Sequence, residues 1–140
     1  MGPDKSMTRA RLLLADDHED LLQEVTLLLE GEFEVIGVAR DGPTLIDSAI
    51  HLSPDVVVTD FKMPGGLSGI DASSVLLERG LCKAVVLLTM YADRELIDGA
   101  LQAGIRGFVL KVRAGEDLIP AIHSALRGET YISPLGAGPV

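Results

Sequence analysis

Five short apolar runs constrain the fold of this chain more than any other feature. Most of them are continuous rather than alternating between apolar and polar residues, which is typical of parallel strands buried on both faces of a sheet. The runs lie at residues 11–15, 33–39, 55–59, 84–89 and 107–110. Each is short enough for a single strand, so the sequence predicts five buried strands.

Segments with apolar residues at helical spacing follow the five runs. They lie at residues 19–30, 44–52, 71–79, 93–103 and 116–127. Four of them are followed directly by a glycine, which is common after a helix: Gly31, Gly80, Gly104 and Gly128. Strand and helix thus alternate five times, and right-handed crossovers turn that order into an α/β fold. We predict a doubly wound, five-stranded parallel sheet with helices on both faces.

Length and composition agree with a single acidic domain. The chain has 140 residues, enough for one core of ordinary size, and no apolar stretch approaches the length of a membrane span. Its net charge of −9 argues against direct binding to nucleic acid or to an anionic membrane, since both require cationic patches. Cys82 is the single cysteine, which suits the cytoplasm. We predict a leader at 1–10, a domain at 11–128 and a linker or tail at 129–140.

Polar side chains stand where the predicted strands end. Asp16 and Asp17 follow the first run, Asp60 follows the third, Thr89 ends the fourth and Lys111 follows the fifth. The carboxyl ends of parallel strands share one edge of the sheet, and ligands bind in the crevice there. We therefore expect these five side chains to meet in one small pocket, although they are far apart in the sequence.

The chemistry of such a pocket favours a cation and a phosphoryl group. Clustered carboxylates repel one another unless a cation intervenes, and Mg²⁺ is often held by one or two carboxylates together with phosphate oxygens. Lys111 adds a charge suited to a phosphoryl oxygen, and the Thr89 hydroxyl can donate a hydrogen bond to it. A carboxylate can then be the acceptor in phosphoryl transfer.

These residues resemble the receiver domains of two-component response regulators. The resemblance spans residues 11–127 and includes the pair Asp16-Asp17, the segment Asp-Phe-Lys-Met-Pro at 60–64, Thr89, and Phe-Val-Leu-Lys at 108–111. It implies the flavodoxin-like receiver topology and a phosphoacceptor signalling function. The resemblance also implies a sensor histidine kinase as the phosphoryl donor and Asp60 as the acceptor.

The resemblance also implies a metal site. Asp17, Asp60 and the backbone carbonyl of Lys62 would ligate Mg²⁺, and Asp16 would act largely through a metal-bound water. A receiver promotes its own magnesium-dependent phosphorylation and dephosphorylation, so no enzyme acting on an external substrate is expected. Lys111 would pair with the phosphoryl group.

The same resemblance extends to regulation. Thr89 and Phe108 would form a conformational switch, and phosphorylation would favour a homodimer. The sequences at 88–91 and 125–134 resemble those of the subclass whose receiver precedes a helix-turn-helix DNA-binding domain. Such a domain would lie outside this chain. Two features depart from the family pattern: Val112 where proline is frequent, and a glycine-rich loop at 65–69 that is one residue longer.

Other interpretations stay open for single residues. Asp16 or Asp17 can cap the helix that follows, and Phe108 can be a plain core residue. His18, next to the acidic pair, is expected to be a solvated first-turn residue rather than a metal ligand. For function, the alternative is a degenerate receiver that acts only as a protein-interaction module.

Two other classes of protein fit the sequence poorly. A flavin binder needs an uncharged first loop to hold a phosphate, and the acidic first loop repels one. A phosphatase with an aspartyl nucleophile usually has a second acid two residues later, where this chain has Lys62.

Overall fold

Six parallel strands form one sheet in the order β2-β1-β3-β4-β5-β6. The computed structural model describes residues 9–90 and 93–134. The strands are β1 (Arg11–Ala15), β2 (Glu34–Ala39), β3 (Val56–Asp60), β4 (Ala84–Thr89), β5 (Gly107–Leu110) and β6 (Tyr131–Ile132). The predicted parallel α/β sheet is confirmed, and it has one more strand than we expected.

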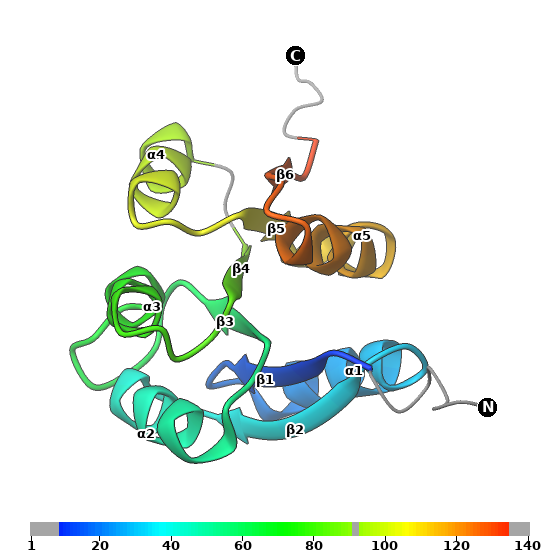
Figure 1. Cartoon of the computed structure of the whole chain (residues 1–140). Coiled ribbons are helices and arrows are strands. Elements are labelled where there is room, and N and C mark those ends of the chain that lie inside the picture. Colours follow the sequence, from blue (N-terminus) through cyan, green and yellow to red (C-terminus); the bar gives the residue numbers. More distant parts are fainter. Residues whose placement is uncertain (1–8, 91–92, 135–140) are drawn as a thin grey trace.

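Helices cover both faces of the sheet, as Figure 1 shows: α2, α3 and α4 lie on one face, and α1 and α5 lie on the other. They are α1 (Glu19–Glu30), α2 (Gly42–Leu52), α3 (Gly69–Glu78), α4 (Arg94–Gln102) and α5 (Ala114–Leu126), with a short 3-10 helix η2 (Lys111–Arg113) before α5. Within the described residues, no helix has both the length and the apolar character needed to cross a bilayer.

Successive side chains of each strand enter two different cores. Leu12 and Leu14 of β1 pack in the core under α1 and α5, whereas Leu13 packs in the core under α2, α3 and α4. Both layers are buried, so most positions of the central strands are apolar, and the polar exceptions Thr59, Asp60 and Thr89 lie at the carboxyl ends of β3 and β4. This explains why the runs in the sequence are continuous rather than alternating.

Polar caps fix where the helices after β2, β3 and β4 begin. Asp41 accepts a hydrogen bond from the Thr44 amide at 2.7 Å at the start of α2. Ser68 accepts one at 3.0 Å from the amide of Asp71 at the start of α3. These bonds satisfy backbone donors that a helix N-terminus leaves unpaired. The caps therefore set the length of the loops that follow the strands.

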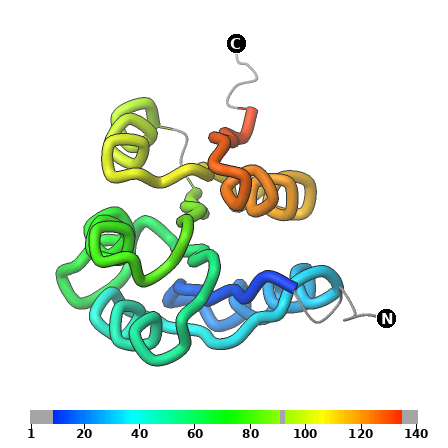
Figure 2. Tube along the Cα trace, viewed as in Figure 1, coloured from blue at the N-terminus to red at the C-terminus, as the bar shows by residue number. Residues whose placement is uncertain are grey.

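The sixth strand lies in the segment that we expected to be a linker or tail. At the end of α5 the chain turns back at Gly128, whose φ is +78°, and β6 then runs along the outer edge of β5. The Tyr131 amide donates to the Arg106 carbonyl at 2.9 Å, and the Ser133 amide donates to the Phe108 carbonyl at 2.8 Å. Figure 2 follows the chain from β1 inside the sheet to β6 at its edge. Ser133, which we placed in a loose tail, is buried.

Candidate functional site

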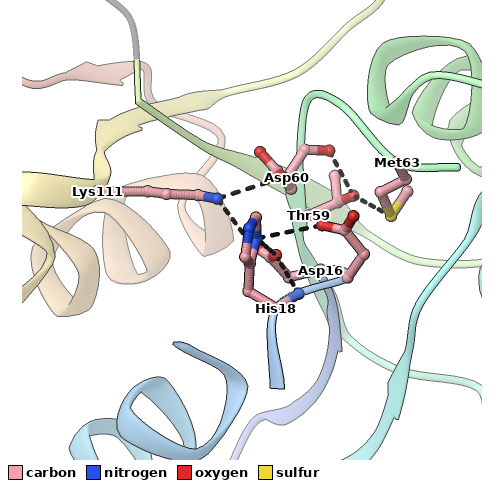
Figure 3. A network of polar contacts seen from close by, with 7 residues as sticks. Asp16, His18, Thr59, Asp60, Met63 and Lys111 are labelled. Carbon is pink, nitrogen blue, oxygen red and sulfur yellow. Dashed lines mark hydrogen bonds and ion pairs between the residues drawn. The ribbon is translucent and has the colours of Figure 1, made fainter. Parts of the chain in front are cut away.

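The ends of β1 and β3 and the turn after β5 bring two carboxylates and an ammonium together. Lys111 Nζ lies 2.9 Å from Asp16 Oδ2 and 3.3 Å from Asp60 Oδ2. In Figure 3 the Lys111 side chain reaches across from one side of the pocket to both carboxylates. The strand order places β1, β3 and β5 with their carboxyl ends at one edge, so the predicted meeting of these residues follows directly from the topology.

A cleft of ≈ 530 Å³ opens beside these side chains. Asp60 is 6% exposed and Asp16 is 3% exposed, whereas Asp17 and Lys62 are exposed at the surface. The cleft is lined by Asp17, His18, Asp60, Phe61, Lys62, Met63, Pro64, Thr89, Met90 and Lys111. The Asp60 carboxylate therefore lines an open cleft while most of its side chain is shielded from water.

A tight backbone contact joins the end of the glycine-rich loop at 65–69 to the chain just after Asp60. The Gly69 amide donates to the Phe61 carbonyl at 2.7 Å, and a Cβ at Gly69 would lie only 1.9 Å from the Asp60 carbonyl oxygen. Only glycine fits a backbone approach this close. Gly65 and Gly66, with φ of +98° and +81°, accommodate the turn before it. The glycine-rich loop thus returns to the backbone at Asp60 and Phe61.

The pocket opposes full ionisation of Asp60. Burial raises the pKa of the Asp60 carboxyl, and the nearby Asp16 carboxylate raises it further, while Lys111 lowers it in part. For Lys111, burial lowers the pKa, but its contacts with Asp16 and Asp60 outweigh burial, so the pKa is raised overall. Lys111 thus stays charged, and a further cation would relieve the remaining repulsion between the carboxylates.

The donor set fits a hard divalent cation. Ligand atoms of Asp16, Asp17, His18 and Asp60 all lie within 4.8 Å of one another. The contact of Lys111 with Asp16 Oδ2 is an ion pair, but among the described residues no donor makes a well-aligned hydrogen bond to this buried oxygen. It keeps lone-pair capacity for a cation or for a water on that cation. Carboxylate oxygens are the ligands that Mg²⁺ prefers.

His18 is exposed at the start of α1, as expected, but it also contacts the acidic pair. Its Nδ1 lies 3.0 Å from Asp16 Oδ1 and 3.2 Å from Asp17 Oδ1, and its amide donates to Asp16 Oδ1 at 2.9 Å. Asp16 therefore bonds the amide of His18, the N-cap residue of α1, as well as Lys111, but no side chain makes a capping hydrogen bond at the start of α1. The two-residue spacing from Asp16 is a signal for the amide bond alone, because an aspartate commonly bonds the amide two residues later.

Thr89 and Phe108 lie on the neighbouring strands β4 and β5. Thr89 ends β4, is 2% exposed and lines the cleft. Phe108 is also 2% exposed and packs in the core under α2, α3 and α4, next to Leu87 across the sheet. The ring already points inward in this structure.

Comparison with known proteins gives one family. The sequence matches the response regulator receiver domain over residues 12–123. It is 34% identical over 126 residues to the oxygen regulatory protein NreC of Staphylococcus carnosus, covering 89% of this chain and 58% of that protein. The chain thus spans less than two thirds of the length of this curated relative.

Solved structures agree with the sequence comparison. A two-component response regulator of the LuxR family from Aurantimonas superposes with a TM-score of 0.83 at 29% identity, covering 90% of this chain and 91% of that one. The isolated receiver domain of RcsB from Salmonella enterica, studied with the phosphomimetic BeF₃⁻, gives a TM-score of 0.80 at 27% identity, with 91% and 94% covered. The chain belongs to the receiver domains of response regulators, the phosphoacceptor modules of two-component signalling.

Proposed function

We propose that Asp60 is the phosphoacceptor and that a sensor histidine kinase is the donor. One carboxylate oxygen of Asp60 forms an O–P bond while the P–N bond to the kinase histidine breaks, and the imidazole leaves. The observation that carries the proposal is the position of Asp60: it lines an open cleft, 3.3 Å from the Lys111 ammonium. The other two aspartates of the pocket do not combine access to the cleft with a shielded position beside the ammonium. Asp16 is buried against Lys111, and Asp17 lies at the surface.

Mg²⁺ is the metal that the proposal assigns to the pocket. Asp17, Asp60 and the backbone carbonyl of Lys62 would hold it, and Asp16 would act largely through a metal-bound water. When bound, it supplies positive charge that offsets the repulsion between the carboxylates and the incoming phosphoryl oxygens. The clustered ligand atoms of the three aspartates support this assignment.

Lys111 and Thr89 are the groups of the chain proposed to contact the phosphoryl group. The Lys111 ammonium would move from its carboxylate partners toward a phosphoryl oxygen, and the Thr89 hydroxyl would donate to another. Both residues line the cleft. Thr89 would then act with Phe108 as the switch that passes the phosphorylation state to the surface. Loss of the phosphoryl group would also occur within this pocket, so the domain catalyses only its own phosphorylation and dephosphorylation.

The proposed signalling role is that of a cytoplasmic domain that controls transcription. Response regulators interact with histidine kinases, and one similar structure is a regulator of the LuxR family. We infer that the Asp60 phosphoryl group controls a DNA-binding domain outside this chain, and that phosphorylation favours a homodimer. A net charge of −9 fits a segment that does not itself bind nucleic acid or an anionic membrane.

A degenerate receiver is the alternative, since such a domain keeps the fold but binds partners without being phosphorylated. The two proposals differ in what they require of the pocket. An interaction module has no need to keep Asp16, Asp60 and Lys111 together in a shielded cluster, where burial raises the pKa of the Asp60 carboxyl. Phosphoryl transfer requires that arrangement, so it is the favoured function.

Phosphorylation by a small-molecule donor tests the proposal. Incubation with acetyl phosphate and Mg²⁺ should add one phosphoryl group, read by intact mass, and a chelator should prevent the addition. Asp60→Asn should abolish it, whereas Asp71→Asn, which changes an exposed aspartate in the first turn of α3, should leave it unchanged. A phosphoryl group on the Asp60→Asn variant would reject the assignment, and no phosphorylation of the unmodified chain would favour the degenerate receiver.

A further inference from the structure

A second buried carboxylate lies outside the phosphorylation pocket and anchors the C-terminal strand. Asp117, on the first turn of α5, is 2% exposed. Its Oδ2 accepts hydrogen bonds from Ser133 Oγ and Arg113 Nε, each at 2.7 Å. Its Oδ1 accepts from Tyr131 Oη at 2.8 Å and from Arg113 at 3.2 Å. Both oxygens are thus satisfied, and two of the three donor residues belong to the segment after α5.

The edge of β5 provides the rest of this docking site. Tyr131 and Ser133 pair with the backbone of β5 and the residue before it through their amides, as described above. The Leu110 amide then donates to Ser133 Oγ at 3.1 Å. Ser133 Oγ therefore accepts a bond from Leu110 and donates one to Asp117. The docked segment has a defined chemistry: Tyr131 and Ser133, on either side of Ile132, both donate hydroxyl hydrogen bonds to the Asp117 carboxylate.

The docking site is continuous with the phosphorylation pocket through a very short piece of chain. Leu110, bonded to Ser133, directly precedes Lys111, whose ammonium contacts Asp16 and Asp60. Lys111 and Arg113 are the first and last residues of the single 3-10 turn η2. One end of this turn therefore holds the pocket lysine, and the other end holds the arginine that clamps Asp117. A backbone displacement at Lys111 would therefore be passed along this three-residue turn to Arg113.

We propose that the β5 edge and Asp117 form a docking site for the segment Tyr131–Ser133, and that phosphorylation releases this segment. The inference rests on the proposed function, because the trigger is Lys111 moving toward a phosphoryl group on Asp60. As Lys111 moves, η2 shifts, Arg113 loses its alignment with Asp117, and the hydrogen bonds of Ser133 to Leu110 and Asp117 weaken. The released segment is the one that leads out of the domain, so release frees whatever follows position 134 from the edge of the sheet.

Amide hydrogen exchange on the whole 140-residue chain tests the release, read residue by residue by NMR with Mg²⁺ alone and with Mg²⁺ and beryllofluoride. The Tyr131 and Ser133 amides should exchange about tenfold faster in the beryllofluoride form, because their pairing to β5 is lost locally. Amides of Phe61 and Lys62 report on the pocket in the same spectra. If the pocket amides do not respond, both the proposed function and the release are wrong. If they respond while Tyr131 and Ser133 exchange at the same rate or more slowly, the release alone is wrong.

Tyr131→Phe isolates the anchor without removing the strand. The substitution keeps the ring and the backbone pairing and deletes only the hydrogen bond from the phenol to Asp117. Exchange at Ser133 should then be faster already with Mg²⁺ alone, and the further increase with beryllofluoride should be smaller. Glu129→Gln, at an exposed residue two positions earlier, should behave as the unmodified chain. Identical exchange in Tyr131→Phe and Glu129→Gln would show that Asp117 is no anchor and would overturn the proposal.

Discussion

Asp60 and Asp117 are both buried carboxylates near a cationic side chain, yet their environments push them in opposite directions. Burial and the neighbouring Asp16 raise the pKa of Asp60. At Asp117, a hydrogen bond from Arg113 in the first place, then those from Ser133 and Tyr131, outweigh burial and lower the pKa to about 2. Burial alone therefore does not decide the charge state, because the number of donors around the carboxylate does.

Asp117 is a carboxylate that stabilises the fold, whereas Asp60 is one that remains available for binding. Asp117 has its hydrogen bonds supplied by the protein, so ionising it favours the folded state. Asp60 shares a single ammonium with Asp16, so part of its interaction capacity remains for groups from outside the chain. Functional sites commonly carry this kind of unsatisfied charge at the expense of stability. Substitutions at the two positions should have opposite effects on unfolding.

Asp117→Asn should give the largest change. Asparagine resembles a protonated aspartate, so the variant should lose the stabilisation that accompanies the lowered pKa, about 2 kcal/mol of unfolding free energy at neutral pH. Because the folded-state pKa lies below the ordinary value of 3.8, this stabilisation is complete above that value and is lost as the pH falls through about 2. Urea denaturation from neutral pH downward should therefore show the two proteins converging in acid.

A neighbouring acid serves as the control for Asp117. Glu116→Gln removes a charge from the same turn of α5, but at an exposed position, so its unfolding free energy should stay close to that of the unmodified chain. Equal losses at the two positions would mean that the loss reflects the charge of the helix N-terminus rather than the network. Curves for Asp117→Asn that stay apart at low pH would contradict the assigned titration.

Magnesium binding should give the next largest change in stability. Asp117 already has a cationic partner in Arg113, whereas the pocket carboxylates gain a further one only when Mg²⁺ binds. At ten times its dissociation constant, a ligand that binds only the folded state adds about 1.4 kcal/mol. For a chain of this size that raises the melting temperature by about 3 to 6 °C, as differential scanning fluorimetry can measure. Asp17→Ala should remove most of the gain, and Asp71→Ala should keep it. A melting temperature indifferent to Mg²⁺ would argue against a metal site.

The pocket was predictable from the sequence, and the Asp117 network was not, for a physical reason. Asp16, Asp60 and Lys111 each follow an apolar run, and the topology of a parallel sheet then brings strand ends together without further information. Asp117 lies inside a helical pattern, where an acid in the first turn is ordinary. Its role depends on β6, a strand of two residues that is too short to leave a periodic signal.

The elements themselves were predicted closely where their ends carry a signal. The first helix and the strands β1, β4 and β5 have the expected bounds, since apolar runs, charges and glycines mark them. The start of α5 was placed two residues too late, because Ala114 and Gly115 carry no capping signal and the N-cap residue Arg113 makes no side-chain cap. The contact of His18 with both acidic residues depends on a side-chain orientation that no spacing rule determines.

Asp60→Asn should give the smallest change, and one of opposite sign to Asp117→Asn. The pKa of Asp60 is raised, so its charged form is disfavoured in the folded state at neutral pH, and removing the charge should stabilise the metal-free protein. Lys111 keeps Asp16 as a partner at 2.9 Å, so no buried ammonium is left unpaired. We expect a gain of at most about 1 kcal/mol in urea denaturation with chelator present, since the lost attraction to Lys111 offsets part of the relief. Added Mg²⁺ should erase the difference or reverse it, because the unmodified pocket binds the cation better. A clear loss of stability in the metal-free variant would mean that Asp60, like Asp117, is satisfied by the fold, and the contrast between the two carboxylates would not hold.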